Sequence, residues 1–169
     1  RNGALRTTHD VDVLTEREGW ERMRARPGAG FAMAPDSARD LETNVHVDVL
    51  FAGDDWDMAF PLPHPQAVSE HDAALGARFM DLHHLLELKC AVYLSKRREY
   101  GVEVAAKDLA DVVELVRHNR DRLPREAVDS MHPAVRRLMR RVMRKVLRAS
   151  LHPRAPRRPR GSPPATPRA

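Results

Sequence analysis

The sequence predicts an α/β protein, α+β in stricter usage, in which a small mixed β-sheet precedes a helical half and a disordered basic tail. Residues 8–14 and 44–51 alternate between apolar and polar side chains, which is the period of a β-strand. From residue 82 onward the apolar residues recur every three or four positions, which is the period of a helix. The final 18 residues hold six prolines and five arginines, a composition that cannot build a core.

These patterns place one folded unit in a chain of 169 residues, which is an ordinary length for a single domain. We expect this unit to cover residues 1–151, with the sheet part over about 1–69 and the helical part over about 70–151. The Pro/Arg-rich tail covers residues 152–169.

The sheet part is expected to contain a strand, a short helix, two further strands and an irregular segment, at residues 8–14, 16–26, 31–34, 44–51 and 52–69. The short helix has Trp20 and Met23 three positions apart and stops at Pro27-Gly28, a pair that terminates helices. The irregular segment contains three prolines within five residues, and proline interrupts both helices and strand ladders.

The helical part is expected to contain four helices, at residues 82–96, 105–118, 124–130 and 135–147. The last of them fits the i, i+3, i+4, i+7 template over three turns, so it is strongly amphipathic. Seven basic side chains lie opposite its apolar stripe: Arg136, Arg137, Arg140, Arg141, Arg144, Lys145 and Arg148.

Charge is distributed unevenly along the chain. Residues 1–134 carry 17 Lys and Arg against 24 Asp and Glu, a net charge of −7, whereas residues 135–169 carry 12 basic residues and no acid. Two interpretations of the basic end stay open. Either this basic end is a solvated face that packs against the acidic residues 1–134, or it binds tRNA or another nucleic acid together with the tail.

Several classes of protein are excluded. No apolar run approaches the ~20 residues that cross a bilayer, and no secretory leader opens the chain, so we expect a cytoplasmic protein without a membrane partner. The single cysteine, Cys90, excludes an internal disulfide framework and a zinc site made of several cysteines. A reducing compartment fits this cysteine usage.

Three acids on the predicted strands are candidate metal ligands. Asp10 and Asp12 are two residues apart, so both carboxylates lie on one face of a strand, and Asp48 sits in the same way on another strand. Mg²⁺ and Mn²⁺ prefer carboxylates, and three on adjacent strands can form a two-metal site for nucleotidyl transfer. Acid-x-acid spacing also occurs elsewhere in the chain, so an isolated solvated acidic patch is the alternative.

The sequence of residues 3–14, GALRTTHDVDVL, resembles the G-x-x-R-x-T-x-D-V-D signature of the nucleotidyltransferase superfamily, the fold of DNA polymerase beta. Residues 46–50, HVDVL, resemble the strand that carries its third carboxylate. Residues 85–89 and 107–115 are similar to two helical blocks of an uncharacterised bacterial branch related to the AbiEii-type toxins. The resemblance spans residues 3–143 in four ordered blocks.

The resemblance implies that Asp10, Asp12 and Asp48 are catalytic metal ligands and that Arg6 and Thr8 lie near nucleotide or substrate. It implies Mg²⁺-dependent transfer of an NMP from an NTP to an acceptor on RNA, protein or a small molecule. The alternative is a non-catalytic, antitoxin-like or RNA-binding module of the same fold. In the family, a Gly-Gly or Gly-Ser turn that cradles the triphosphate precedes the signature, and we expect that turn upstream of the first residue.

Three further candidate positions lie on the first long helix. Lys89 lies in an apolar stripe, where a lysine either extends to solvent or meets an anion, so it is a candidate contact to phosphate or carboxylate. His83 and His84 are interpreted as partly buried or surface histidines without partner ligands at metal spacing. Cys90 is interpreted as a small core residue.

Overall fold

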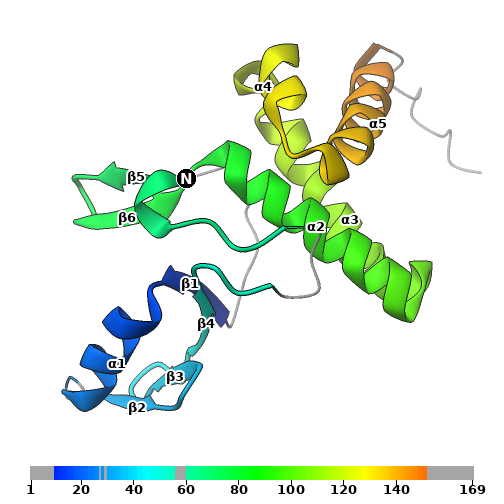
Figure 1. Ribbon diagram of the computed structural model, residues 1–169. Helices are drawn as coiled ribbons and strands as arrows, with labels where there is room; N and C mark the ends of the chain where they lie inside the picture. The colour runs from blue at the N-terminus through cyan, green and yellow to red at the C-terminus, as the bar shows by residue number, and fades with distance from the viewer. Residues whose placement is uncertain (1–9, 27, 29, 56–59, 152–169) are drawn as a thin grey trace, which may run out of the picture.

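The computed structural model describes residues 10–26, 28, 30–55 and 60–151. Within them a four-stranded mixed sheet and a two-stranded hairpin precede a helical C-terminal half (Figure 1). The predicted α+β class, the mixed sheet and the helical second half are therefore confirmed. Arg6, Thr8 and the predicted tail at 152–169 lie outside the described residues. None of the helices in the described part of the chain combines the length and apolar character needed to cross a bilayer.

The main sheet has the strand order β1-β4-β3-β2. Strand β4 pairs in parallel with β1 and antiparallel with β3, and β3 pairs antiparallel with β2. The strands and the helix that follows the first of them are β1 (Asp10–Thr15), α1 (Arg17–Ala25), β2 (Phe31–Met33), β3 (Ser37–Asp40) and β4 (His46–Phe51). Strand β3 was not predicted, because its sequence SARD has no apolar alternation and only its two neighbours make it a strand.

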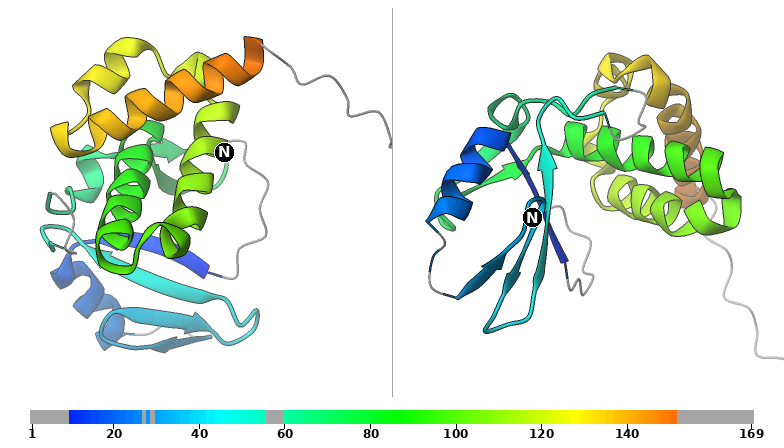
Figure 2. Two further views of the ribbon diagram at one scale, coloured as in Figure 1. Left: turned by 90° about the vertical axis from the view of Figure 1, so that its right-hand side faces the viewer. Right: turned by 60° about the horizontal axis from the view of Figure 1, so that its bottom comes forward.

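One face of this sheet packs on α1. Trp20 of α1 is buried against Ala38, Val49 and Phe51, and its indole Nε1 donates to the carbonyl of Pro35 at 2.9 Å. The other face meets the helical half, because Leu50 of β4 belongs to the main core with the helices. Figure 2 shows the sheet between α1 on one side and the helices on the other.

The segment after β4 is irregular as predicted and contains one described 3₁₀ turn, η1 (Pro65–Ala67). A hairpin follows, with β5 (Ser69–Asp72) paired antiparallel to β6 (Ala77–Met80). This hairpin was not predicted: most of its residues were expected in the helical part, whereas regular helix begins only after β6. Its strands are four residues long with mostly exposed or half-buried side chains, so they leave little periodic signal.

The helical half contains α2 (Leu82–Tyr100), α3 (Val102–His118), η2 (Arg120–Arg122), α4 (Arg125–Ser130) and α5 (Pro133–Leu151). All four predicted helices are present, and three of them are longer than expected. Gly101, with φ of +88°, separates α2 from α3; this left-handed region favours glycine, which lacks a Cβ. Leu86, Val112, Val116 and Met139, all under 1% exposed, form the centre of the core between α2, α3 and α5.

Candidate active site

The parallel pairing of β1 with β4 brings two of the predicted carboxylates together. Asp12 and Asp48 are direct register partners, so their Cα atoms are about 4.8 Å apart and their side chains point to the same side of the sheet. Asp10 shares that face by alternation and stands opposite His46. The sheet thus places the three predicted acids on one face of two neighbouring strands.

The carboxylates lie on the part of this sheet face that the helical half does not cover. On the same face but nearer the strand ends, Leu14 and Leu50 pack against the core of the helices. The residues of β1 accordingly change from exposed to half-buried along the strand, and those of β4 change from half-buried to buried. Asp12 and Asp48 therefore remain accessible to a ligand while the strands beneath them are fixed by packing.

A cleft of about 480 Å³ opens at this place. Four of its lining residues are acids and one is an arginine, so its electrostatic potential favours a cation. The described lining residues are Asp12, Arg17, Asp36, Ser37, His46, Asp48, Val49, Phe51 and Asp54. Asp10 is not among them, although it shares the face.

Two contacts order the side chains of the cleft. His46 Nε2 lies 3.0 Å from Asp48 Oδ1, which holds that carboxylate in place. At the other end, Arg17 Nη2 donates to both carboxylate oxygens of Asp54, at 3.1 and 2.9 Å, and its guanidinium carbon lies 4.1 Å from the centre of the Phe51 ring. Sequence reasoning missed Arg17, since a single arginine after a strand carries no local signal of its neighbours.

Of the remaining predicted site residues, Arg6 and Thr8 lie outside the described residues, and Lys89 does not line the cleft. Lys89 is half-buried on α2. Cys90 is fully buried, and this burial, followed by the nearby Glu87 carboxylate, raises the pKa of its thiol to about 12. Its predicted role as a small core residue is confirmed.

His83 and His84 are half-buried, as expected, but the expectation that no partner ligand stands at metal spacing was wrong. Glu87 lies one helical turn further along α2, and one ligand atom from each of the three residues falls within 4.8 Å of the others. The signal was readable in the sequence, because residues at i+3 and i+4 share a helix face. This group differs in chemistry from the carboxylates on the sheet, because two of its three members are imidazoles.

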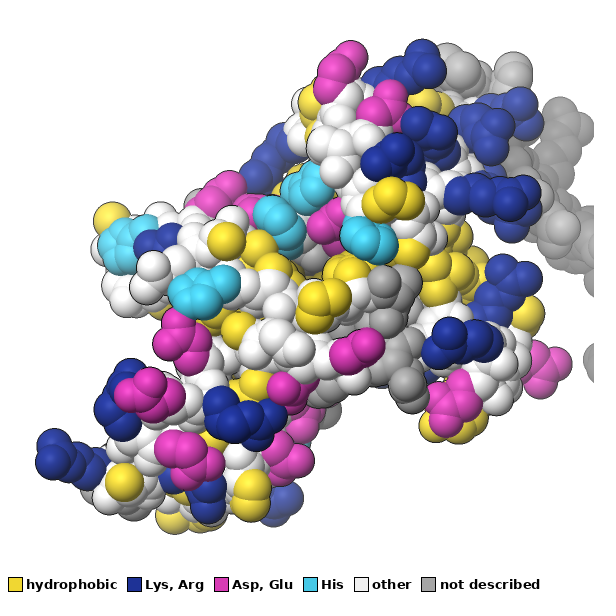
Figure 3. Space-filling view, in the orientation of Figure 1, with side chains coloured by type: hydrophobic (Ala, Val, Ile, Leu, Met, Phe, Trp, Pro, Cys, Tyr) yellow, Lys and Arg dark blue, Asp and Glu magenta, His cyan; other side chains and the backbone are white. Residues whose placement is uncertain are grey.

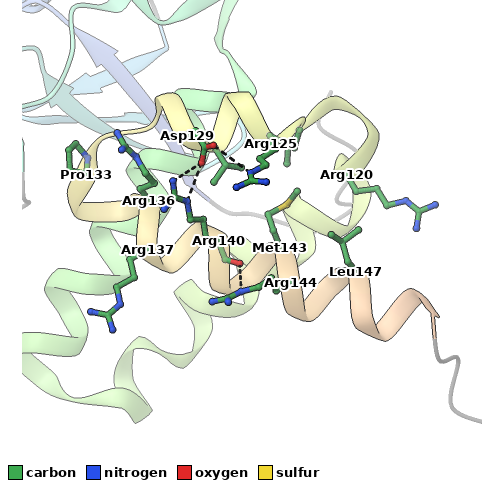
Figure 4. A pocket seen from close by; sticks show the side chains of 12 residues that line it. Arg120, Arg125, Asp129, Pro133, Arg136, Arg137, Arg140, Met143, Arg144 and Leu147 are labelled. Carbon is green, nitrogen blue, oxygen red and sulfur yellow. Dashed lines mark hydrogen bonds and ion pairs between the residues drawn. The ribbon is translucent and has the colours of Figure 1, made fainter.

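The basic residues of α5 border a second cavity of about 970 Å³, between α5 and the segment from η2 to α4 (Figure 4). Its lining includes four apolar residues, Leu123, Val128, Met143 and Leu147, and six arginines, Arg120, Arg125, Arg136, Arg137, Arg140 and Arg144.

Five of these arginines have partners among the described residues: Arg120 with Asp121, Arg125 and Arg140 with Asp129, Arg136 with Met131, and Arg144 with the carbonyl of Arg140. Arg140 donates to Asp129 Oδ1 at 2.8 and 3.1 Å, and this hydrogen bond holds the pKa of Asp129 below its usual value. Arg136 donates to the carbonyl of Met131. The basic face is therefore partly neutralised rather than uniformly solvated.

Comparisons with protein-family models, with curated proteins and with solved structures give no match to this chain. The resemblance to nucleotidyltransferases therefore stays a prediction from the sequence.

Proposed function

We propose that the protein is a Mg²⁺-dependent nucleotidyltransferase that works at the cleft between β1 and β4. One observation carries the proposal: Asp12 and Asp48, which are far apart in the sequence, are register partners on adjacent parallel strands, with Asp10 on the same face. The donor set fits the metal, because accessible carboxylate oxygens are the ligands that Mg²⁺ prefers. When bound there, Mg²⁺ neutralises the charge of a triphosphate.

The residues of the cleft suit the transfer of an NMP unit. An acceptor oxygen attacks the α-phosphorus of the NTP, the bond from that phosphorus to the pyrophosphate oxygen breaks, and the acceptor proton leaves to a base or to water. Asp48, held by His46, is placed to orient the acceptor. Arg17, whose guanidinium pairs with Asp54, lies at the far end of the cleft, where its remaining N–H groups can contact phosphate oxygens.

Binding of Mg²⁺ is expected to raise the melting temperature, because a ligand of the native state alone stabilises it by mass action. Replacing Asp10 and Asp12 together by Asn is expected to abolish this shift, since it removes two of the three negative ligands. The measurement is thermal unfolding with 0 and about 10 mM MgCl₂, a concentration chosen well above a millimolar Kd.

The matched control for this measurement is Asp40→Asn. Asp40 lies on β3 and accepts backbone hydrogen bonds from Glu42 and Thr43, which the Oδ1 of Asn can also accept. This variant is expected to keep the Mg²⁺ shift of the parent. If the Asp10/Asp12 double variant responds to Mg²⁺ as the parent does, the cation binds elsewhere and the proposed site is wrong.

A second candidate function, favoured by the arginine-lined cavity, is an RNA-binding module of the same fold. Six arginines from η2, α4 and α5 converge on one region, and clustered arginines bind the phosphates of nucleic acids. In this alternative the carboxylates of the sheet have no catalytic role, and the basic face of α5 carries the function.

Binding of tRNA, if it uses this face, is expected to weaken steeply with salt. Replacing Arg137 and Arg144 by Ala is expected to reduce the slope of log K against log[salt] by roughly 2, about one for each lost phosphate contact. The control variant Arg22→Ala/Arg24→Ala removes two arginines from α1, which pair with Glu18 and Glu21 there. Fluorescence anisotropy between 50 and 300 mM salt, a range in which such slopes are resolved, measures tRNA binding by the parent and by the two variants. Equal slopes for all three proteins would contradict binding at α5.

A further inference from the structure

The N-terminal part of α2 presents a group of metal-binding side chains that the proposed transfer reaction does not use. His83 Nε2 lies 3.7 Å from Glu87 Oε1, and the rings of His83 and His84 lie with their centres 5.1 Å apart at an angle of 68°. One ligand atom from each residue lies within 4.8 Å of the other two. In Figure 3 histidine side chains gather near this part of α2, close to an acidic side chain.

Asp81 fixes the ring of His84 in a state that leaves one nitrogen for a metal. His84 Nδ1 lies 2.7 Å from Asp81 Oδ2, and an ionised carboxylate only accepts hydrogen bonds, so Nδ1 carries the proton. The neutral imidazole then has its lone pair on Nε2. Histidine ligands of metals in proteins are typically held in this way by a carboxylate that accepts from the other ring nitrogen.

Glu87 is held by the turn before α5. Its Oε1 accepts a hydrogen bond from the backbone N–H of His132, which lies in the turn before α5. The Glu87 side chain is only 12% exposed, and the ion pair that the described structure gives it is with His83. A partly buried carboxylate is stabilised by hydrogen bonds and by positive charge nearby, and a cation between the three side chains would add such charge.

The spacing fits a small ion of the first transition series. Zn²⁺ binds imidazole nitrogen and carboxylate oxygen at about 2.0–2.2 Å, so tetrahedral ligand atoms are roughly 3.4 Å apart. The contact between His83 and Glu87 is already close to this value. The other separations are at most 4.8 Å, so they exceed this value by no more than roughly 1.4 Å, a difference that a side-chain rotation of His83, which is 26% exposed, can close.

We propose that His83, His84 and Glu87 form a binding site for Zn²⁺ or a chemically similar transition-metal ion, with Asp81 as the residue that positions His84. Two imidazoles and one carboxylate favour such ions over Mg²⁺, which prefers oxygen ligands alone. Three protein ligands leave a fourth position for water or a substrate atom. Because Glu87 also holds the His132 amide, the bound ion stiffens the contact between α2 and the turn before α5.

The test is calorimetric titration of the metal-free full chain with ZnCl₂. The parent is expected to bind one equivalent at this site, and His83→Ala/His84→Ala is expected to weaken that binding at least 30-fold. The matched control His71→Ala/His118→Ala removes two exposed histidines from other elements and is expected to bind within threefold of the parent. Thermal unfolding without metal checks that all three proteins fold.

Asp81→Asn separates a positioning role from a purely structural one. Asn keeps an oxygen that can accept the His84 backbone N–H and cap α2, but it loses the charge that orients the imidazole. We expect 10- to 100-fold weaker Zn²⁺ binding without a change in the melting temperature of the metal-free protein. Co²⁺ as a spectroscopic probe is expected to show visible d–d bands in the parent and to lose them in His83→Ala/His84→Ala.

Three results would overturn the proposal: no saturable Zn²⁺ binding by the parent, equal binding by the parent and His83→Ala/His84→Ala, or a loss of Zn²⁺ binding in Asp10→Asn/Asp12→Asn that matches the loss in the histidine variant. The third result would place the ion at the carboxylates of the sheet. The proposal shares no residue with the nucleotidyltransferase cleft, so either one can fail without the other.

Discussion

Replacement of Asp48 by Asn is expected to cut nucleotidyl transfer by about 100-fold or more while NTP binding stays within a few fold. Loss of one preorganised electrostatic group in an active site typically costs this much in kcat. The amide keeps the size of the side chain and an oxygen that can face His46, which lies 3.0 Å from Asp48. The loss is therefore one of charge beside Asp12 rather than of structure.

The measurement uses the full-length gene product with α-³²P-labelled NTPs and cell extract, followed by separation of RNA, protein and small molecules. This separation identifies the class of the acceptor together with the rate. Asp40→Asn, which removes a carboxylate from the same sheet outside the cleft, is expected to transfer at the parental rate. A parent protein that labels nothing with any of the four NTPs would contradict the enzyme proposal and leave the RNA-binding module.

Replacement of Leu86 by Ala is expected to lower the free energy of unfolding by about 3 kcal/mol, within the range measured for buried leucines. Leu86 is fully buried on α2 and belongs to the core that contains residues of α3, α5 and β4. The substitution removes apolar contacts and leaves a cavity that the rigid helices around it cannot fully close. Urea denaturation followed by circular dichroism measures the change.

The control for the stability measurement is Leu41→Ala. Leu41 is 63% exposed, so its truncation is expected to change the free energy of unfolding by no more than about 0.5 kcal/mol. Similar losses in both variants would show that Leu86 does not lie in a packed core. A smaller denaturant slope in Leu86→Ala alone would indicate that the sheet and the helical half no longer unfold together.

The proposed cleft and the proposed metal site differ in how far their chemistry was visible in the sequence. The three carboxylates were selected from strand alternation and from the resemblance of residues 3–14 and 46–50. Glu87 was overlooked although it stands at helix spacing from two histidines. The link from Glu87 to His132 carries no such signal, because those two residues are joined only when the turn before α5 folds back onto α2.

The sequence by itself determined the elements with strong internal periodicity. Strands β1 and β4 and helices α2, α3 and α5 were predicted within a few residues, because every second or every third and fourth side chain must be apolar where one face is buried. The uneven distribution of charge was likewise a property of the sequence alone.

Only the tertiary structure decided which elements meet. Strands β3, β5 and β6 have little alternation and exist because a neighbouring strand supplies their hydrogen bonds. The parallel pairing of β1 with β4, which sets Asp12 opposite Asp48, joins segments separated by a helix and two other strands. Strand register depends on packing and on contacts between distant residues, so local periodicity places each carboxylate on a face but does not determine which carboxylates share a site.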